Sequence, residues 1–84
     1  MSVADFKKAA AQCVTTSEEV INMLHEVEKK TVDLRMLMAF LEGSSNPNVQ
    51  TAVSSLAVVQ QAFDAHYASL QLFKDSIETY GQSL

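Results

Sequence analysis

Residues 41–49, Leu-Glu-Gly-Ser-Ser-Asn-Pro-Asn-Val, form the one turn-rich segment of the chain, and this segment decides the fold. A helix commonly ends at a glycine in the left-handed conformation, which is the role we expect for Gly43. Asn46 is a favourable N-cap, and Pro47 follows at the first helical position, where its missing N–H costs nothing. A connection of about four residues suits two antiparallel helices. The segment therefore predicts a turn at 43–46 between two helices.

Apolar or small residues continue outward from this turn along both arms with the same period. Before the turn they are Phe6, Ala10, Cys13, Ser17, Val20, Leu24, Val27, Thr31, Leu34, Met38 and Leu41. After the turn they are Val49, Ala52, Leu56, Val59, Phe63, His66, Leu70, Phe73, Ile77, Tyr80 and Leu84. Spacings that alternate between three and four residues are typical of a coiled-coil seam. Each arm is thus predicted to be one long amphipathic helix.

The two seams match each other when the arms are paired antiparallel. The pairing starts with Leu41 opposite Val49 and continues without a gap toward the termini, where Ala10 faces Tyr80. Small side chains then stand opposite large ones, which is what close packing requires. The pattern predicts an all-α fold, an antiparallel two-helix hairpin with coiled-coil-like packing.

We expect the whole chain to be a single hairpin, with helices over about 3–42 and about 47–81. Ser2 with Asp5 fits a capping box at the first helical turn. Two further capping boxes overlap near residues 15–17 and would allow a break in the first helix there. A continuous helix is favoured because the seam stays in register through this segment.

Composition bounds the possible partners. The chain has 84 residues, a formal charge of −4 and only six basic residues, which disfavours nucleic acid and a basic membrane-surface helix. Residues 43–63 carry no charge, but polar side chains fill the stretch, so no transmembrane segment is predicted. The first residues lack the apolar core of a signal peptide. We expect a protein made in the cytoplasm and exported, to the cell surface or beyond, without a classical signal peptide.

A chain this small with one cysteine has no internal disulfide, so we expect a protein partner to complete its core. Apolar residues outside the seam gather mainly toward the turn and mark a contact with another chain. This predicted partner-binding patch comprises Val32, Met36, Leu37, Phe40, Val53, Val58, Ala62, Ala65 and Leu72. Its small members on the second helix would let another helix approach closely.

No arrangement of residues points to catalysis or to a cofactor. Cys13 is placed on the seam facing Ile77, without a neighbouring base to activate it. His66 is predicted on the seam with His25 at the same level, and Asp64 and Glu28 lie within a turn of them. Zinc is disfavoured because this ligand spacing matches no known motif. A pH-sensitive assembly contact is the better interpretation of the histidines, and we expect no enzyme and no metal site.

The turn resembles that of the WXG-type hairpin proteins of type VII secretion, with Leu41-Glu42-Gly43 in place of Trp-x-Gly. The first arm is similar to that family at residues 6–10, 17–20 and 33–34. Tyr80 begins what would be the family's Tyr-x-x-x-Asp/Glu export motif, although Leu84 replaces the acidic residue. The resemblance implies a homodimer or a heterodimer with a similar hairpin, packed as a four-helix bundle, in which one partner supplies the export signal.

A weaker resemblance is to the needle subunits of type III secretion. Ser45-Asn46-Pro47 resembles their turn, and Phe73-Lys74-Asp75-Ser76-Ile77 resembles a segment near their C-terminus. That resemblance implies a homopolymer that grows helically instead of a closed dimer. A third possibility with the same fold is a small cytoplasmic adaptor or chaperone that shields a helix of its partner. All three functions depend on helix–helix association.

Overall fold

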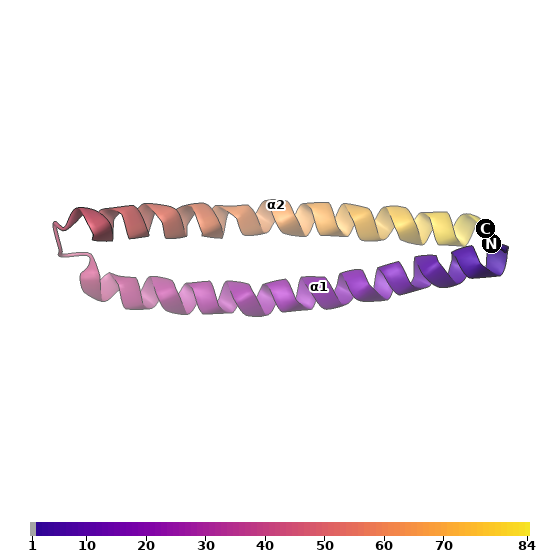
Figure 1. Cartoon of the computed structure of the whole chain (residues 1–84), viewed down its shortest axis with the longest axis horizontal. Helices are drawn as coiled ribbons and strands as arrows, with labels where there is room; N and C mark the ends of the chain where they lie inside the picture. Colours follow the sequence, from indigo (N-terminus) through magenta and orange to yellow (C-terminus); the bar gives the residue numbers. More distant parts are fainter. Residues whose placement is uncertain (1) are drawn as a thin grey trace.

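Two long antiparallel helices make up almost the whole molecule, as Figure 1 shows. The computed structural model describes residues 2–84. Helix α1 spans Val3–Met38 and continues into a short 3-10 turn, η1, at Ala39–Leu41. Helix α2 spans Pro47–Ser83. The predicted all-α helical hairpin is confirmed, and α2 ends two residues later than expected.

Helix α1 begins where the sequence predicted. The Ser2 hydroxyl accepts a hydrogen bond from the backbone N–H of Asp5 at 3.2 Å, and the Asp5 carboxylate accepts one from the N–H of Ser2 at 3.1 Å. This reciprocal pair is the predicted capping box. The helix then runs through residues 15–17 without a break, and the Ser17 hydroxyl donates to the Cys13 carbonyl one turn earlier at 2.7 Å. The prediction of a continuous helix is confirmed.

The turn differs from the prediction at its first step. Gly43 does not adopt a left-handed conformation, since no described residue has a positive φ. The helix ends instead by tightening into η1, in which hydrogen bonds join residues three apart instead of four. These bonds satisfy carbonyls of the last turn. The Ser44 N–H then donates to the Leu41 carbonyl at 2.9 Å. On the far side Asn46 caps α2 by accepting from the N–H of Asn48 at 2.8 Å, with Pro47 at the first position, as predicted.

The helices pack along a line that is rotated relative to the predicted seam. Half of each predicted seam does face the other helix, namely Ala10, Ser17, Leu24, Thr31 and Met38 on α1 and Val49, Leu56, Phe63, Leu70 and Ile77 on α2. At the other half of the predicted seam positions, the residue that faces the partner helix is the next one along the chain. The less exposed residues there are Val14, Ile21 and Glu28 on α1 and Gln60, Tyr67, Lys74 and Gly81 on α2. We call these two sets together the inner rows.

Side chains in the inner rows explain why the helices are rotated relative to the predicted seam. They allow close approach of the two helices or form polar contacts across them. Gly81 lets the helices come close, so that a Cβ built on it would lie 3.2 Å from the Cβ of Ala10. Lys74 reaches across to Glu18 at 3.3 Å while its aliphatic stem covers the seam. Two predictions fail as a result. Cys13 and His66 were placed on the seam, and both are exposed.

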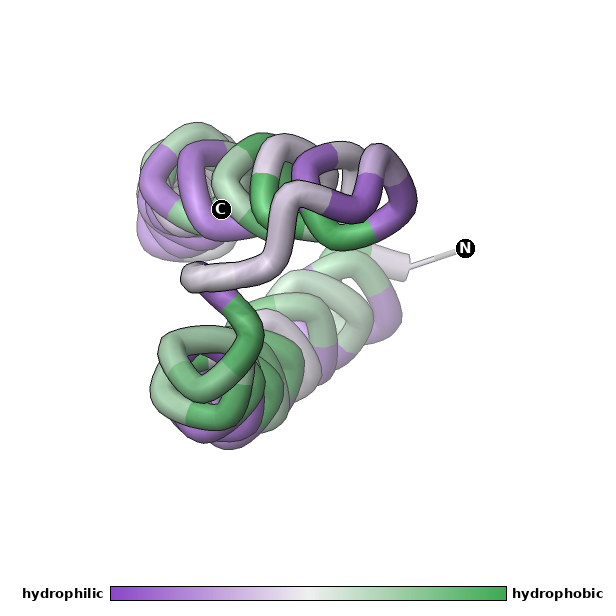
Figure 2. The backbone as a smooth tube through the Cα atoms, turned by 90° about the vertical axis from the view of Figure 1, so that its left-hand side faces the viewer, coloured by the Kyte–Doolittle hydropathy of each residue, from purple (hydrophilic) through white to green (hydrophobic). Residues whose placement is uncertain are grey.

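Residues 2–84 form a rod of two helices with no third layer. Its dimensions are 62 × 16 × 16 Å. The helices converge toward the termini in Figure 1, where Ala10 meets Gly81, and are further apart near the turn, where larger side chains fill the interface. Figure 2 looks along the rod from the turn and shows one helix over the other, with nothing covering their sides. The turn end of α1 is largely apolar in this view.

Candidate functional site

The rotation of the helices leaves one apolar row of each helix exposed beside the inner rows. These rows are Phe6, Cys13, Val20, Val27, Leu34 and Leu41 on α1 and Ala52, Val59, His66, Phe73 and Tyr80 on α2. Each row stands one residue before an inner row, so in an antiparallel hairpin both rows border the same side of the contact line. We call this surface the apolar face. Its large apolar side chains are between 39% and 52% exposed.

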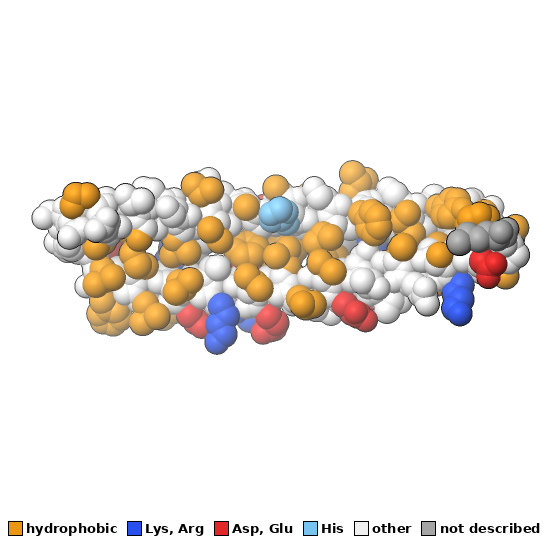
Figure 3. Space-filling model, in the orientation of Figure 1, with side chains coloured by type: hydrophobic (Ala, Val, Ile, Leu, Met, Phe, Trp, Pro, Cys, Tyr) orange, Lys and Arg blue, Asp and Glu red, His pale blue; other side chains and the backbone are white. Residues whose placement is uncertain are grey.

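A groove in the terminal half of the molecule confirms that the two rows share one side. Cys13 and Val20 of α1 line it together with Leu70 and Phe73 of α2, and its volume is about 450 Å³. Figure 3 shows apolar side chains following the line where the helices meet over the length of the rod, with charged ones on the outer edge of α1. A continuous apolar strip of this kind marks a contact with another macromolecule.

The opposite side of the contact line, the polar face, has a different chemistry. Tyr67 crosses from α2 to α1, where its hydroxyl donates to the Glu28 carboxylate at 3.0 Å and lies 2.9 Å from Nδ1 of His25. The His25 and Tyr67 rings stack with centroids 4.5 Å apart. Partial burial raises the pKa of the Tyr67 hydroxyl, and the hydrogen bond and charge of Glu28 and the charge of Asp64 add to the effect. The cluster ties the two helices together at mid-length.

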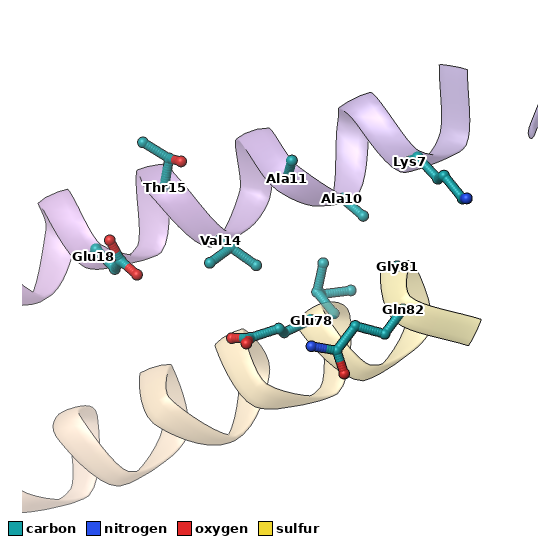
Figure 4. A pocket seen from close by; sticks show the side chains of 10 residues that line it. Lys7, Ala10, Ala11, Val14, Thr15, Glu18, Glu78, Gly81 and Gln82 are labelled. Atoms are coloured by element: carbon teal, nitrogen blue, oxygen red, sulfur yellow. The ribbon is translucent and has the colours of Figure 1, made fainter. Parts of the chain in front are cut away.

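A second groove on the polar face lies near the termini, with a volume of about 560 Å³. Figure 4 shows its side chains, which come from the first turns of α1 and the last turns of α2. Its rim carries one cation, Lys7, and two carboxylates, Glu18 and Glu78. Because Lys74 already pairs with Glu18, the rim holds no concentrated charge that would select a ligand.

The predicted partner-binding patch is divided by the structure. Met36, Leu37 and Phe40 lie together with Asp33 around a shallow hollow of about 330 Å³ near the turn, and Phe40 is 86% exposed. We call Met36, Leu37 and Phe40 the turn cluster. Val53 is separated from it and borders a groove with Arg35 and other residues of the contact line.

The remaining predicted patch residues spread along the rod. Val58, Ala65 and Leu72 follow one another at seven-residue spacing and form an exposed row on the outside of α2. Ala62 is only partly exposed. Val32 is exposed on the polar-face side of α1, one heptad after His25. Helical geometry therefore keeps the turn cluster together and distributes the other members over different sides.

The two histidines are not neighbours. His25 belongs to the polar face, where it contacts Tyr67, whereas His66 belongs to the apolar face. Over residues 2–84, no three histidine, cysteine or acidic side chains converge closely enough to hold a metal ion. Tyr67 replaces His66 at the helix contact and was not among the predicted site residues. Its amphipathic side chain is the signal, since the ring packs on an apolar surface while the hydroxyl reaches polar groups.

No family model, curated protein or solved structure matches this chain. Within residues 2–84, neither long helix has a stretch apolar enough to cross a membrane.

Proposed function

We propose that this protein is a non-enzymatic helical-hairpin subunit or substrate of a specialised bacterial protein-secretion system and that it acts by associating with further helices. The observation that carries the proposal is the lack of a core. Of the described residues, only Ala10, Phe63, Ser17 and Thr31 are buried. A rod with so few buried side chains is half of a packed structure, and the apolar face and the turn cluster are the surfaces that remain to be covered.

The surface area supports association quantitatively. The chain exposes 6296 Å². A compact monomer of this mass would expose about 4,900 Å². The excess is roughly 1,400 Å², more than the roughly 800 Å² that each partner buries in a standard protein interface. Covering one long side with a second hairpin would bring the exposed area per chain to that of an ordinary globular protein.

The resemblance to WXG-type proteins supports the secretion role. It rests on Leu41-Glu42-Gly43 at the turn, on the similarity of the first arm, and on Tyr80 at the start of the export motif. The two-helix hairpin architecture agrees with what this resemblance implies. With Leu84 in place of the acidic residue, export depends on a partner hairpin that supplies the complete signal.

Two experiments test the proposal. Light scattering over a range of concentrations is expected to show a discrete homodimer or, with a co-expressed neighbouring hairpin, a discrete heterodimer. Long polymers in electron micrographs would instead indicate a needle subunit, and a tight complex with an unrelated helical protein would indicate an adaptor. In the native host, we expect the protein in the culture medium or at the cell surface. Deletion of the membrane ATPase of a type VII system should abolish this export, and unchanged export would contradict the secretion role.

A further inference from the structure

We propose that the apolar face is the docking surface for a second copy of this chain, with the two rods antiparallel. This inference rests on the proposed function, because it assigns the face and the orientation of the helix–helix association. It differs from the partner-binding patch predicted from the sequence, most of which lies on other sides of the molecule.

Charge favours a second copy at this face. The exposed rows that define it contain no aspartate, glutamate, lysine or arginine. The whole chain carries a formal charge of −4, so two copies repel each other overall. The polar face carries Glu28 and Asp64 near the contact line, besides Glu18, which pairs with Lys74. The apolar face is therefore where two copies approach with little electrostatic cost.

A row of small residues at the edge of the face allows close packing. Ser55, Ala62, Ser69 and Ser76 run along α2 beside the apolar row, at seven-residue spacing. Small side chains leave room for large ones from a neighbouring helix. In a dimer, large side chains on the apolar face of the second copy, such as Val27 and Phe73, would fill this space.

Side-chain size sets the orientation. The aromatic members of the face, Phe6, Phe73 and Tyr80, all lie in the terminal half of the rod, whereas the turn half has Ala52 and aliphatic residues. A parallel dimer would crowd the aromatic rings against each other and leave the turn half underfilled. An antiparallel dimer places the aromatic half of each copy level with the smaller side chains in the turn half of the other, with Phe6 level with Ala52.

Val27 and Val32 provide a matched pair of variants for the test. Both are valines on α1, 52% and 47% exposed, and they lie on opposite sides of the contact line. We expect Val27→Lys to weaken self-association at least tenfold in sedimentation equilibrium, while Val32→Lys changes it less than twofold. Because both side chains are half-exposed, lysine is tolerated in each helix, and circular dichroism checks that both variants keep their helix content.

A charge-reversal pair tests the orientation. Val27 lies a few residues from the middle of the rod toward the turn, and Phe73 lies a similar distance toward the termini. In the antiparallel dimer, Val27 of one copy is therefore level with Phe73 of the other. The variants Val27→Lys and Phe73→Glu should each dimerise poorly alone and should form a heterodimer when mixed.

The single cysteine reports the same geometry by a distance. Cys13 is exposed on the apolar face, about ten residues from the middle of the rod. At ~1.5 Å per residue, spin labels on the two Cys13 residues should be roughly 30 Å apart in the antiparallel dimer and less than about 15 Å apart in a parallel one. A short distance would overturn the orientation.

The outcomes separate this inference from the proposed function. If Val27→Lys dimerises as the wild type does, or if Val32→Lys is equally damaging, the assignment of the face is wrong while association itself stands. A chain that stays monomeric alone but pairs with a different hairpin would also overturn the second copy as the occupant. A chain that pairs with nothing would contradict both.

Discussion

Ala10 of α1 and Gly81 of α2 face each other so closely that a Cβ added to Gly81 would lie 3.2 Å from the Cβ of Ala10. This contact replaces the predicted pairing of Ala10 with Tyr80. Along both helices, every second position of the predicted seam is likewise replaced by the following residue. The absence of a side chain on Gly81 allows the terminal ends of the helices to converge, and it turns Tyr80 outward onto the apolar face.

Gly81→Leu is expected to destabilise the hairpin by about 1–3 kcal/mol, because the added side chain overpacks the contact with Ala10. The better helix propensity of leucine offsets only part of this cost. Thermal unfolding followed by circular dichroism measures the effect. Adding Ala10→Gly to the same chain should recover part of the lost stability. If the single variant is as stable as the wild type, the helices are not in close contact here.

Gly43→Ala serves as the matched glycine at the other end of the rod. A Cβ on Gly43 would meet nothing within 4 Å, and the residue does not have a positive φ. Alanine should therefore stabilise the folded chain by about 0.4–1 kcal/mol, by restricting the unfolded one. The midpoint of urea unfolding measures this gain. A loss of stability would show that Gly43 needs the left-handed conformation predicted from the sequence.

Asn46→Ala removes the cap of α2, where the side-chain oxygen accepts the hydrogen bond from Asn48. We expect a loss of about 1 kcal/mol, the usual cost of replacing a capping asparagine by alanine. Asn46→Asp keeps an acceptor at the same place and should retain most of the stability. If urea unfolding shows the same loss of stability in Asn46→Ala and Asn46→Asp, the loss does not come from the missing cap.

Tyr67→Phe should change how stability depends on pH. The pKa of Tyr67 is raised in the folded chain, so its contribution is present below the ordinary tyrosine pKa of 10.0 and is lost as the pH rises through the raised value. The wild type should therefore lose more thermal stability between about pH 9 and about pH 11 than Tyr67→Phe does. Identical slopes for wild type and Tyr67→Phe would contradict the cross-helix hydrogen bond.

Leu37→Asp tests the turn cluster, in which Leu37 lies beside Met36 and Phe40. Helix content should be unchanged, since the side chain is exposed, while assembly should weaken by about tenfold, equivalent to ~1.4 kcal/mol. Leu72→Asp, on the exposed outer row of α2, is the control and should assemble normally. Analytical ultracentrifugation compares the two variants. Unchanged assembly of Leu37→Asp would show that the turn cluster is not part of the interface.

Local signals in the sequence were sufficient for the start of each helix. The Ser2 and Asp5 capping box and the Asn46 cap followed by Pro47 involve residues within three positions of each other, so their hydrogen bonds depend little on the rest of the chain. Gly43 was predicted wrongly because a helix has more than one way to satisfy its last carbonyls, and the η1 turn does so without a left-handed residue.

The candidate site required more than local signals. The turn cluster was predictable because Met36, Leu37 and Phe40 are neighbours on one helix. The apolar face was not, since its residues were assigned to the buried seam. Tyr67 was missed for the same reason, because its place at the contact line depends on which way α2 is turned.

The sequence by itself determined that this chain is an antiparallel helical hairpin, because the 3.5-residue period on both arms and the turn between them allow little else. It did not determine which side of each helix is buried. Each helix has an apolar surface wider than one seam, and a single partner helix covers only part of it. The tertiary structure decided the choice through side chains that meet across the contact, with Gly81 against Ala10 and Tyr67 against Glu28. What those contacts left uncovered is the apolar face.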